Sequence, residues 1–153
     1  MPLIADRLAV LGLELPAIAT PAGAYIPAVV SGNLVFTSGQ LPFVSGALAA
    51  TGKVGGAVSP DDAKTYAATC VLNALAAVQS AIGSLDRVTR IVKVVGFVAS
   101  DPSFTGQPGV INGASELLGE IFGDAGVHAR SAVGVAVLPL DSPVEVELIV
   151  EFA

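Results

Sequence analysis

Five polar residues of this 153-residue chain have side chains that could together hold and activate a small carboxylate ligand: Arg130, Glu145, Ser38, Tyr25 and Asn112. A guanidinium can bind a carboxylate through two parallel hydrogen bonds, and a glutamate can act on water as a general base. Each residue also has a plainer explanation. Tyr25 could cover the core, Ser38 could belong to a turn, and Asn112 could cap a loop. The residues alone leave both interpretations open.

Arg130 and Glu145 lie in the C-terminal stretch HARSAVGVAVLPLDSPVEVELIVEFA, which alternates in polarity. Apolar residues occupy every second position from 144 to 152, and the residues after Arg130 alternate between valines and small residues. A period of two is typical of β-strands, and the segment around Leu140 predicts a turn between them. We therefore expect a β-hairpin whose valine-rich rows face the core, with Arg130 and the glutamates sharing the other face.

Such a hairpin keeps Arg130 and Glu145 apart. A turn centred after Leu140 would place Arg130 opposite Glu151, with Glu145 about six residues away along the sheet, which is roughly 20 Å. One hairpin cannot then bring both residues into one site, so either they have separate roles or a second copy of the chain supplies one of them. The alternative is an ordinary solvated strand face with an Arg130–Glu151 pair.

The remaining sequence predicts the elements that would position these residues. Ser59 can cap a long helix ahead of Pro60, and Gly83 can end it. The other expected elements are a short helix over 2–13, two strands around a Gly32-Asn33 turn, a glycine-rich loop over 41–58, a strand ending before Asp101-Pro102, and a helix closed by Gly123. This order predicts one α+β domain over residues 1–153, with helices on one face of a mixed or mostly antiparallel sheet.

Composition narrows the classes of function. Charged residues make up 13% of the chain and hydrophobic residues 53%, which favours an oligomer that buries much of its surface. The row of small residues Ala132, Gly134 and Ala136 would let another chain or a ligand approach closely.

Several classes are disfavoured. Cys70 and His128 are the single cysteine and histidine, which argues against a metal site built on these ligands. Seven basic against 13 acidic residues argue against nucleic-acid binding. Prolines interrupt the uncharged stretch 15–52, so we expect no membrane span. The N-terminus lacks the order of a signal peptide, and we expect a cytoplasmic protein.

Four stretches, in this order over nearly the whole chain, resemble the YjgF/RidA family of reactive-intermediate deaminases: GNLVFTSGQLP, VINGASELL, HARSAVGVAVLP and PVEVELIVEFA. The resemblance implies a chorismate-mutase-like α+β fold, with two main helices on one face of a mixed β-sheet. It also implies a homotrimer with three clefts between subunits, which would let Arg130 and Glu145 of different copies meet.

The resemblance further implies hydrolysis of enamines and imines such as 2-aminoacrylate and 2-iminopropionate to a 2-keto acid and ammonia, with no metal or organic cofactor. The family's carboxylate-binding arginine falls on Arg130, and its water-activating glutamate on Glu145. Its other substrate-binding positions fall on Ser38, Gly39, Tyr25 and Asn112, and its cysteine is replaced by Ala132, which would contribute its backbone.

The longer N-terminus, the 41–58 loop and the SFTGQPG segment resemble a longer subgroup of the family. A trimeric protein that binds small carboxylates without turnover is the second hypothesis for this chain, and an endoribonuclease is the third.

Overall fold

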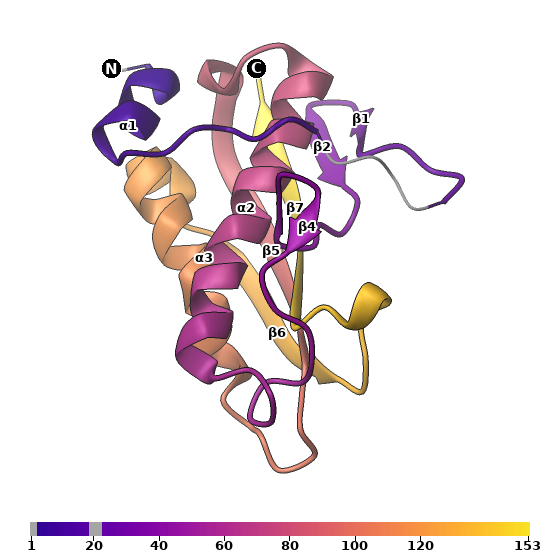
Figure 1. The fold of residues 1–153 in the computed structure, drawn as a ribbon. Coiled ribbons are helices and arrows are strands. Elements are labelled where there is room, and N and C mark those ends of the chain that lie inside the picture. The colour runs from indigo at the N-terminus through magenta and orange to yellow at the C-terminus, as the bar shows by residue number, and fades with distance from the viewer. Residues whose placement is uncertain (1–2, 19–22) are drawn as a thin grey trace.

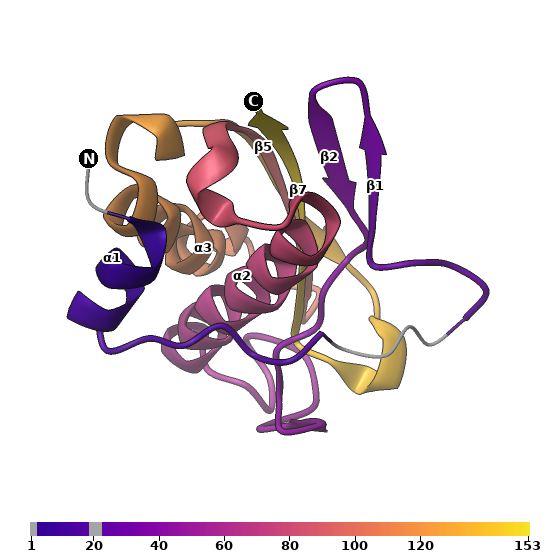
Figure 2. The same cartoon turned by 90° about the horizontal axis from the view of Figure 1, so that it is seen from above.

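The computed structural model describes residues 3–18 and 23–153. Five strands form the main sheet: β1 (Ala28–Ser31), β2 (Leu34–Thr37), β5 (Val88–Ala99), β6 (Ala129–Val135) and β7 (Val144–Phe152). Their order across the sheet is β1-β2-β7-β5-β6. Two long helices, α2 (Pro60–Ile82) and α3 (Gln107–Phe122), cover one face of the sheet (Figures 1 and 2). The α+β class and the mixed sheet are therefore confirmed.

Smaller elements complete the fold. The short helix α1 (Ile4–Val10) lies beside α3, and the predicted 41–58 loop contains a two-stranded hairpin of β3 (Phe43–Val44) and β4 (Ala47–Leu48). Three 3₁₀ turns follow α2, α3 and β6: η1 (Leu85–Arg87), η2 (Gly123–Gly126) and η3 (Pro139–Asp141).

Helix α2 begins and ends where the sequence predicts. The Ser59 hydroxyl accepts a hydrogen bond from the Asp62 N–H at 3.1 Å, Pro60 occupies the first helical position, and Gly83 ends the helix with a φ of 92°. By length and hydropathy alone α2 could cross a membrane, but 56% of its most apolar stretch is buried inside the fold. It is the central core helix of this chain.

The pairing predicted for the C-terminal hairpin is wrong. Strands β6 and β7 are not neighbours, because β5 lies between them. Strand β6 runs parallel to β5 with Arg130 opposite Val94, and β7 runs antiparallel to β5 with Glu145 opposite Phe97. Alternation identified the two strands but not their partner. The 12-residue β5 offers two edges, and the α3 crossover delivers β6 parallel to one of them.

Arg130 and the glutamates do not share a face of the sheet. Arg130 pairs with Val94, which is buried toward the helices, so Arg130 also projects to that side. Glu145 alternates with the buried residues Val144 and Val146 and therefore projects to the face that carries no helix. The prediction of one common face failed because it assumed that the valines of β6 face the core, as those of β7 do.

Among the small residues of β6, Gly134 lies against a side chain of α3. A Cβ atom added at Gly134 would lie 2.8 Å from the Gln107 side-chain nitrogen on that helix. The predicted Arg130–Glu151 pair is also wrong, since Glu151 accepts a hydrogen bond from Thr89 at 2.7 Å and lies 4.0 Å from Arg90.

The core fills the space between the sheet and the two long helices, and its largest fully buried side chains include Val35, Ile91, Leu148, Leu75, Ile111 and Leu118. The backbones of α2 and α3 approach closely at Gly113, where an added Cβ would overlap the Lys64 carbonyl oxygen. Because that atom belongs to a helix backbone, it cannot move aside as a flexible side chain would.

We predict that Gly113→Ala lowers the free energy of unfolding by about 1–3 kcal/mol, the usual effect of overpacking a core. Gly119→Ala is the matched control on the same helix, because its added Cβ meets nothing within 4 Å. The control should be neutral or stabilising by up to about 1 kcal/mol, since alanine favours helix. Urea unfolding followed by circular dichroism measures both, and equal losses would contradict the close contact of α2 with α3.

Candidate functional site

Three hydrogen bonds hold the Arg130 side chain against α3. Nη1 donates to Asn112 Oδ1 at 2.8 Å and to Ser115 Oγ at 3.2 Å, and Nη2 donates to the Pro108 carbonyl at 3.4 Å. All three acceptors are uncharged. In the described part of the chain no carboxylate forms an ion pair with Arg130. The guanidinium is thus fixed in position with its charge not neutralised.

The remaining donors of Arg130 are arranged for a carboxylate. In residues 3–18 and 23–153, the Nε–H and one Nη2–H have no hydrogen-bond acceptor. These two nitrogens lie on the same edge of the planar guanidinium and match the spacing of two carboxylate oxygens. Arg130 can therefore accept a bidentate anionic ligand without losing its contacts with α3.

Ser115 and His128 support Arg130, although sequence reasoning did not place either in the site. His128 Nδ1 lies 2.6 Å from the Gly126 carbonyl oxygen, so this nitrogen carries a proton and donates. In the neutral ring Nε2 then accepts from the Ser115 hydroxyl, 2.8 Å away, which leaves the Ser115 oxygen to accept from Arg130. The three-residue spacing of Asn112 and Ser115, on one helix face, was the signal that could have identified Ser115.

Glu145 lies beside the segment that follows β2. A Cβ atom added at Gly39 would be 2.7 Å from the Glu145 carboxyl carbon, so a larger residue there would require the Glu145 side chain to move. Gln40 and Val146 exchange backbone hydrogen bonds of 2.8 and 3.1 Å, which fix the segment against the start of β7. Ser38 Oγ donates to the Ile26 carbonyl at 2.6 Å, so its lone pairs remain available as acceptors.

The environment of Glu145 suits a general base. Its partial burial raises the pKa of the carboxyl group above the ordinary glutamate value, and the negative charge of Glu147 raises it further. No hydrogen bond or ion pair to this carboxylate is formed by the residues that the structure describes. A partly desolvated carboxylate with a raised pKa binds a proton more readily than a solvated one.

Tyr25 and Ala132 are the other two predicted residues. Tyr25 lies just before β1 and is 51% exposed. Ala132 lies on the edge strand β6, opposite Gly96 of β5, and is partly buried.

Within one chain the predicted residues form two groups instead of one site. Arg130 and Asn112 meet on the helix-covered side of the sheet, whereas Gly39 and Glu145 meet on the helix-free side. The β5 partners of Arg130 and Glu145 are three residues apart, and two strand spacings separate β6 from β7. Their Cα atoms are therefore about 14 Å apart. A ligand of a few atoms cannot contact both groups in one chain.

Cys70 is a packed core residue. It is fully buried in α2, and burial raises the pKa of its thiol. No group of three or more His, Cys, Asp or Glu side chains in the described ranges is placed to hold a metal ion.

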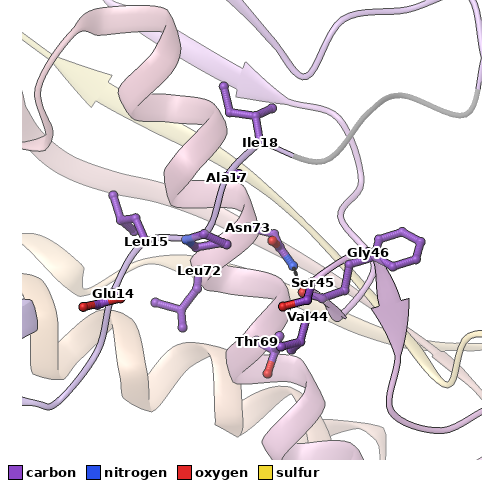
Figure 3. A pocket seen from close by; sticks show the side chains of 12 residues that line it. Glu14, Leu15, Ala17, Ile18, Val44, Ser45, Gly46, Thr69, Leu72 and Asn73 are labelled. Carbon is purple, nitrogen blue, oxygen red and sulfur yellow. Dashed lines mark hydrogen bonds between the residues drawn. The ribbon is translucent and has the colours of Figure 1, made fainter.

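A cavity of about 800 Å³ lies apart from all the predicted site residues. It is open to solvent on one side and is lined by residues 14–18, by the turn between β3 and β4, and by α2 (Figure 3). Sequence reasoning missed it, because its walls come from three segments that are distant in sequence and meet only in the folded chain.

Comparison with known proteins identifies the family. Residues 5–152 match the family described as YjgF/chorismate mutase-like, putative endoribonuclease. "Protein TCP17" of Trypanosoma cruzi is 45% identical over 149 residues, which cover 97% of this chain and 93% of that protein.

Two solved structures show the same fold. A putative endoribonuclease from Shewanella oneidensis is 35% identical, with a TM-score of 0.96 and coverage of 99% of this chain and 100% of that one. E. coli TdcF with bound serine is 27% identical, with a TM-score of 0.65 and coverage of 90% and 99%. These matches confirm the resemblance seen in the sequence motifs, and the chain belongs to the YjgF/chorismate-mutase-like family.

Proposed function

We propose that this protein hydrolyses small 2-imino acids and their enamine tautomers, such as 2-iminopropionate and 2-aminoacrylate, to 2-keto acids and ammonia. The free edge of the Arg130 guanidinium carries the proposal, because it offers a fixed bidentate site for a carboxylate. The serine bound in TdcF is an amino acid of the corresponding size, which supports a ligand of this class.

The catalytic cleft in this proposal lies between subunits of a homotrimer. Arg130 and Glu145 project from opposite faces of one sheet, so a small substrate needs them from different chains. The large apolar side chains Phe36 and Val133 are 40% and 44% exposed. Both belong to the helix-free face of the sheet, on which Glu145 also lies. Exposed apolar surface of this kind favours burial against another copy.

The reaction requires only two groups from the protein, one that binds the carboxylate and one that acts as a general base. Arg130 holds the carboxylate, and Glu145 of a neighbouring subunit removes a proton from water as its oxygen bonds to the imine carbon. That proton passes to nitrogen, which leaves a tetrahedral carbon with one hydroxyl and one amino group. Glu145 then transfers the hydroxyl proton to nitrogen as the carbon–nitrogen bond breaks, so ammonia leaves and the oxygen remains as the keto group. Because an imine carbon is already electrophilic, no metal or organic cofactor is required.

The other residues orient the substrate in this proposal. Ser38 can accept a hydrogen bond from the imine N–H, since its own proton is donated to Ile26. Asn112 keeps the guanidinium in place. Tyr25 and the backbone of Ala132 complete the binding surface.

The experiments below also test two other functions, namely RNA cleavage and carboxylate binding without turnover. The family description and the Shewanella relative carry the endoribonuclease name, and RNA cleavage is also a hydrolysis. A net charge of −6 disfavours RNA, because phosphate binding relies on basic side chains. A trimer that binds carboxylates without turnover would keep the Arg130 contacts but show no dependence on Glu145.

We predict that Arg130→Ala abolishes binding of pyruvate and that Arg130→Lys weakens it by at least about tenfold, because lysine keeps the charge but loses the planar fork. Isothermal titration calorimetry measures both. Arg90→Ala is the matched control, since Arg90 belongs only to a surface ion pair with Glu151. Unchanged affinity in both Arg130 variants would show that Arg130 is not the carboxylate site.

We predict that Glu145→Gln keeps pyruvate affinity but slows imine hydrolysis by about 10² or more, because it preserves the shape of the side chain and removes the base. A dehydratase that generates the imine in the cuvette supplies the substrate. Mixed trimers refolded from Arg130→Ala and Glu145→Gln chains should regain part of the activity, because some clefts then contain both native residues. Full activity of Glu145→Gln alone would exclude the glutamate as the base.

The raised pKa of Glu145 predicts the pH dependence. A base must be ionised, so activity should fall as the pH drops through this raised pKa. Glu147→Gln removes one cause of the shift and should move the midpoint of this acid limb to lower pH. Glu116→Gln, on α3 in an ion pair with Lys64, should leave the midpoint unchanged. A shift to higher pH in Glu147→Gln would contradict the assignment of this limb to Glu145.

A further inference from the structure

The cavity beside α2 has mostly apolar walls. Leu15 and Ile18 line it from the N-terminal segment, Phe43 and Val44 from the β3–β4 hairpin, and Leu72 from α2. Its volume of about 800 Å³ lies in the range of 300–1,000 Å³ that is usual for small-molecule sites. It shares no residue with the proposed deaminase cleft.

Asn73 places one hydrogen-bond acceptor in the wall of this cavity. The residue is 3% exposed, and its Nδ2 donates to the carbonyls of Leu41 and Phe43 at 3.1 and 3.0 Å. These two bonds fix the amide so that Oδ1 is the atom left over, and no described residue donates to it. Figure 3 shows Asn73 between the N-terminal segment and the hairpin turn. A ligand N–H can satisfy this oxygen.

The polar groups around the opening favour a cation. Glu14 lies at the cavity and is exposed, and no ion pair joins it to a basic side chain of residues 3–18 or 23–153. Ser45 and Thr69 contribute hydroxyl groups. Because no lysine or arginine lines the cavity, an anionic ligand would meet a carboxylate and no compensating charge.

The walls of the cavity are anchored to the rest of the fold. The Ile4 N–H donates to Asp86 at 2.7 Å and Arg7 Nε donates to the Glu120 carbonyl at 2.8 Å, so α1 is fixed at the start of the wall-forming segment. Figure 2 shows this segment continuing across α2. On the other side Ser45 and Gly46 have φ values of 51° and 80°, as in a tight two-residue hairpin turn.

We propose that this cavity is a second ligand site, which binds a small amphipathic amine. The apolar body of the amine fills the space between Leu15, Val44 and Leu72, an N–H reaches Asn73 Oδ1, and Glu14 attracts the positive charge. This site is independent of the proposed deaminase activity, because it contains none of the residues assigned to that reaction.

Two probes of similar size test the proposal: phenethylamine and 3-phenylpropionate, which carry opposite charges. Titration of the ¹⁵N-labelled protein by NMR should show phenethylamine shifting the backbone amides of 14–15, 17–18, 43–46 and 69–73, with a dissociation constant on the order of 1 mM or lower. 3-Phenylpropionate should bind there at least about tenfold more weakly, and Glu14→Gln should weaken phenethylamine severalfold. Shifts around Arg130 would instead report the deaminase site, which pyruvate would block.

A substitution that fills the cavity with a large side chain tests directly whether the probe binds there. Thr69→Trp on α2 should abolish the phenethylamine shifts, whereas Thr65→Trp, one turn earlier and exposed, should leave them intact. If Thr69→Trp fails to fold, Val44→Trp on the exposed hairpin serves the same purpose. The proposal is overturned if neither probe shifts the cavity amides, if both probes bind equally, or if the filled variants bind as the native protein does.

Discussion

The pairing of β5 along both of its edges is the constraint on which the rest of the structure depends. One edge takes β7 in antiparallel register, and the other takes β6 in parallel register after the α3 crossover. Because side chains on neighbouring strands share a face where their residues pair, this arrangement directs Arg130 toward α3 and Glu145 away from it. The same arrangement places α3 close enough to supply every acceptor that holds the Arg130 guanidinium.

The pairing of β5 separates the candidate site into one half around Arg130 and another around Glu145. Each half is well ordered on its own: Arg130 is held by Asn112 and Ser115, and Glu145 packs against the backbone at Gly39. Neither half contains what the other provides, since the first has charge and hydrogen-bond donors and the second has an acceptor for protons. An assembly of identical chains would bring one half from each of two chains together, and this is the physical basis for proposing a shared cleft.

The electrostatics of the two halves fit the chemistry proposed for them. An arginine held by neutral acceptors keeps its full charge for a ligand, whereas a salt bridge would compete with the ligand. A glutamate beside a second glutamate and partly removed from water has a raised pKa, which strengthens it as a base. The cavity at α2 differs from both halves of this site. Its charged group is the exposed carboxylate of Glu14, and its hydrogen-bond acceptor is the buried side-chain amide of Asn73.

The sequence by itself determined the local elements and the family. Ser59, Pro60 and Gly83 bounded α2, the Gly32-Asn33 turn joined β1 to β2, and alternation marked β6 and β7, because caps, turns and side-chain periods depend on residues close along the chain. Its motifs also named Asn112, which the structure places against Arg130, and Gly39, which it places against Glu145.

Only the tertiary structure decided which strand lies beside which. Alternation specifies that every second residue shares a face, but it does not say which face meets the helices or which strand is the neighbour. The expected hairpin therefore failed, and with it the common face for Arg130 and Glu145. Ser115, His128 and the cavity around Asn73 were equally beyond local reasoning, since their contacts join segments that are distant in sequence and meet only after the helices pack on the sheet.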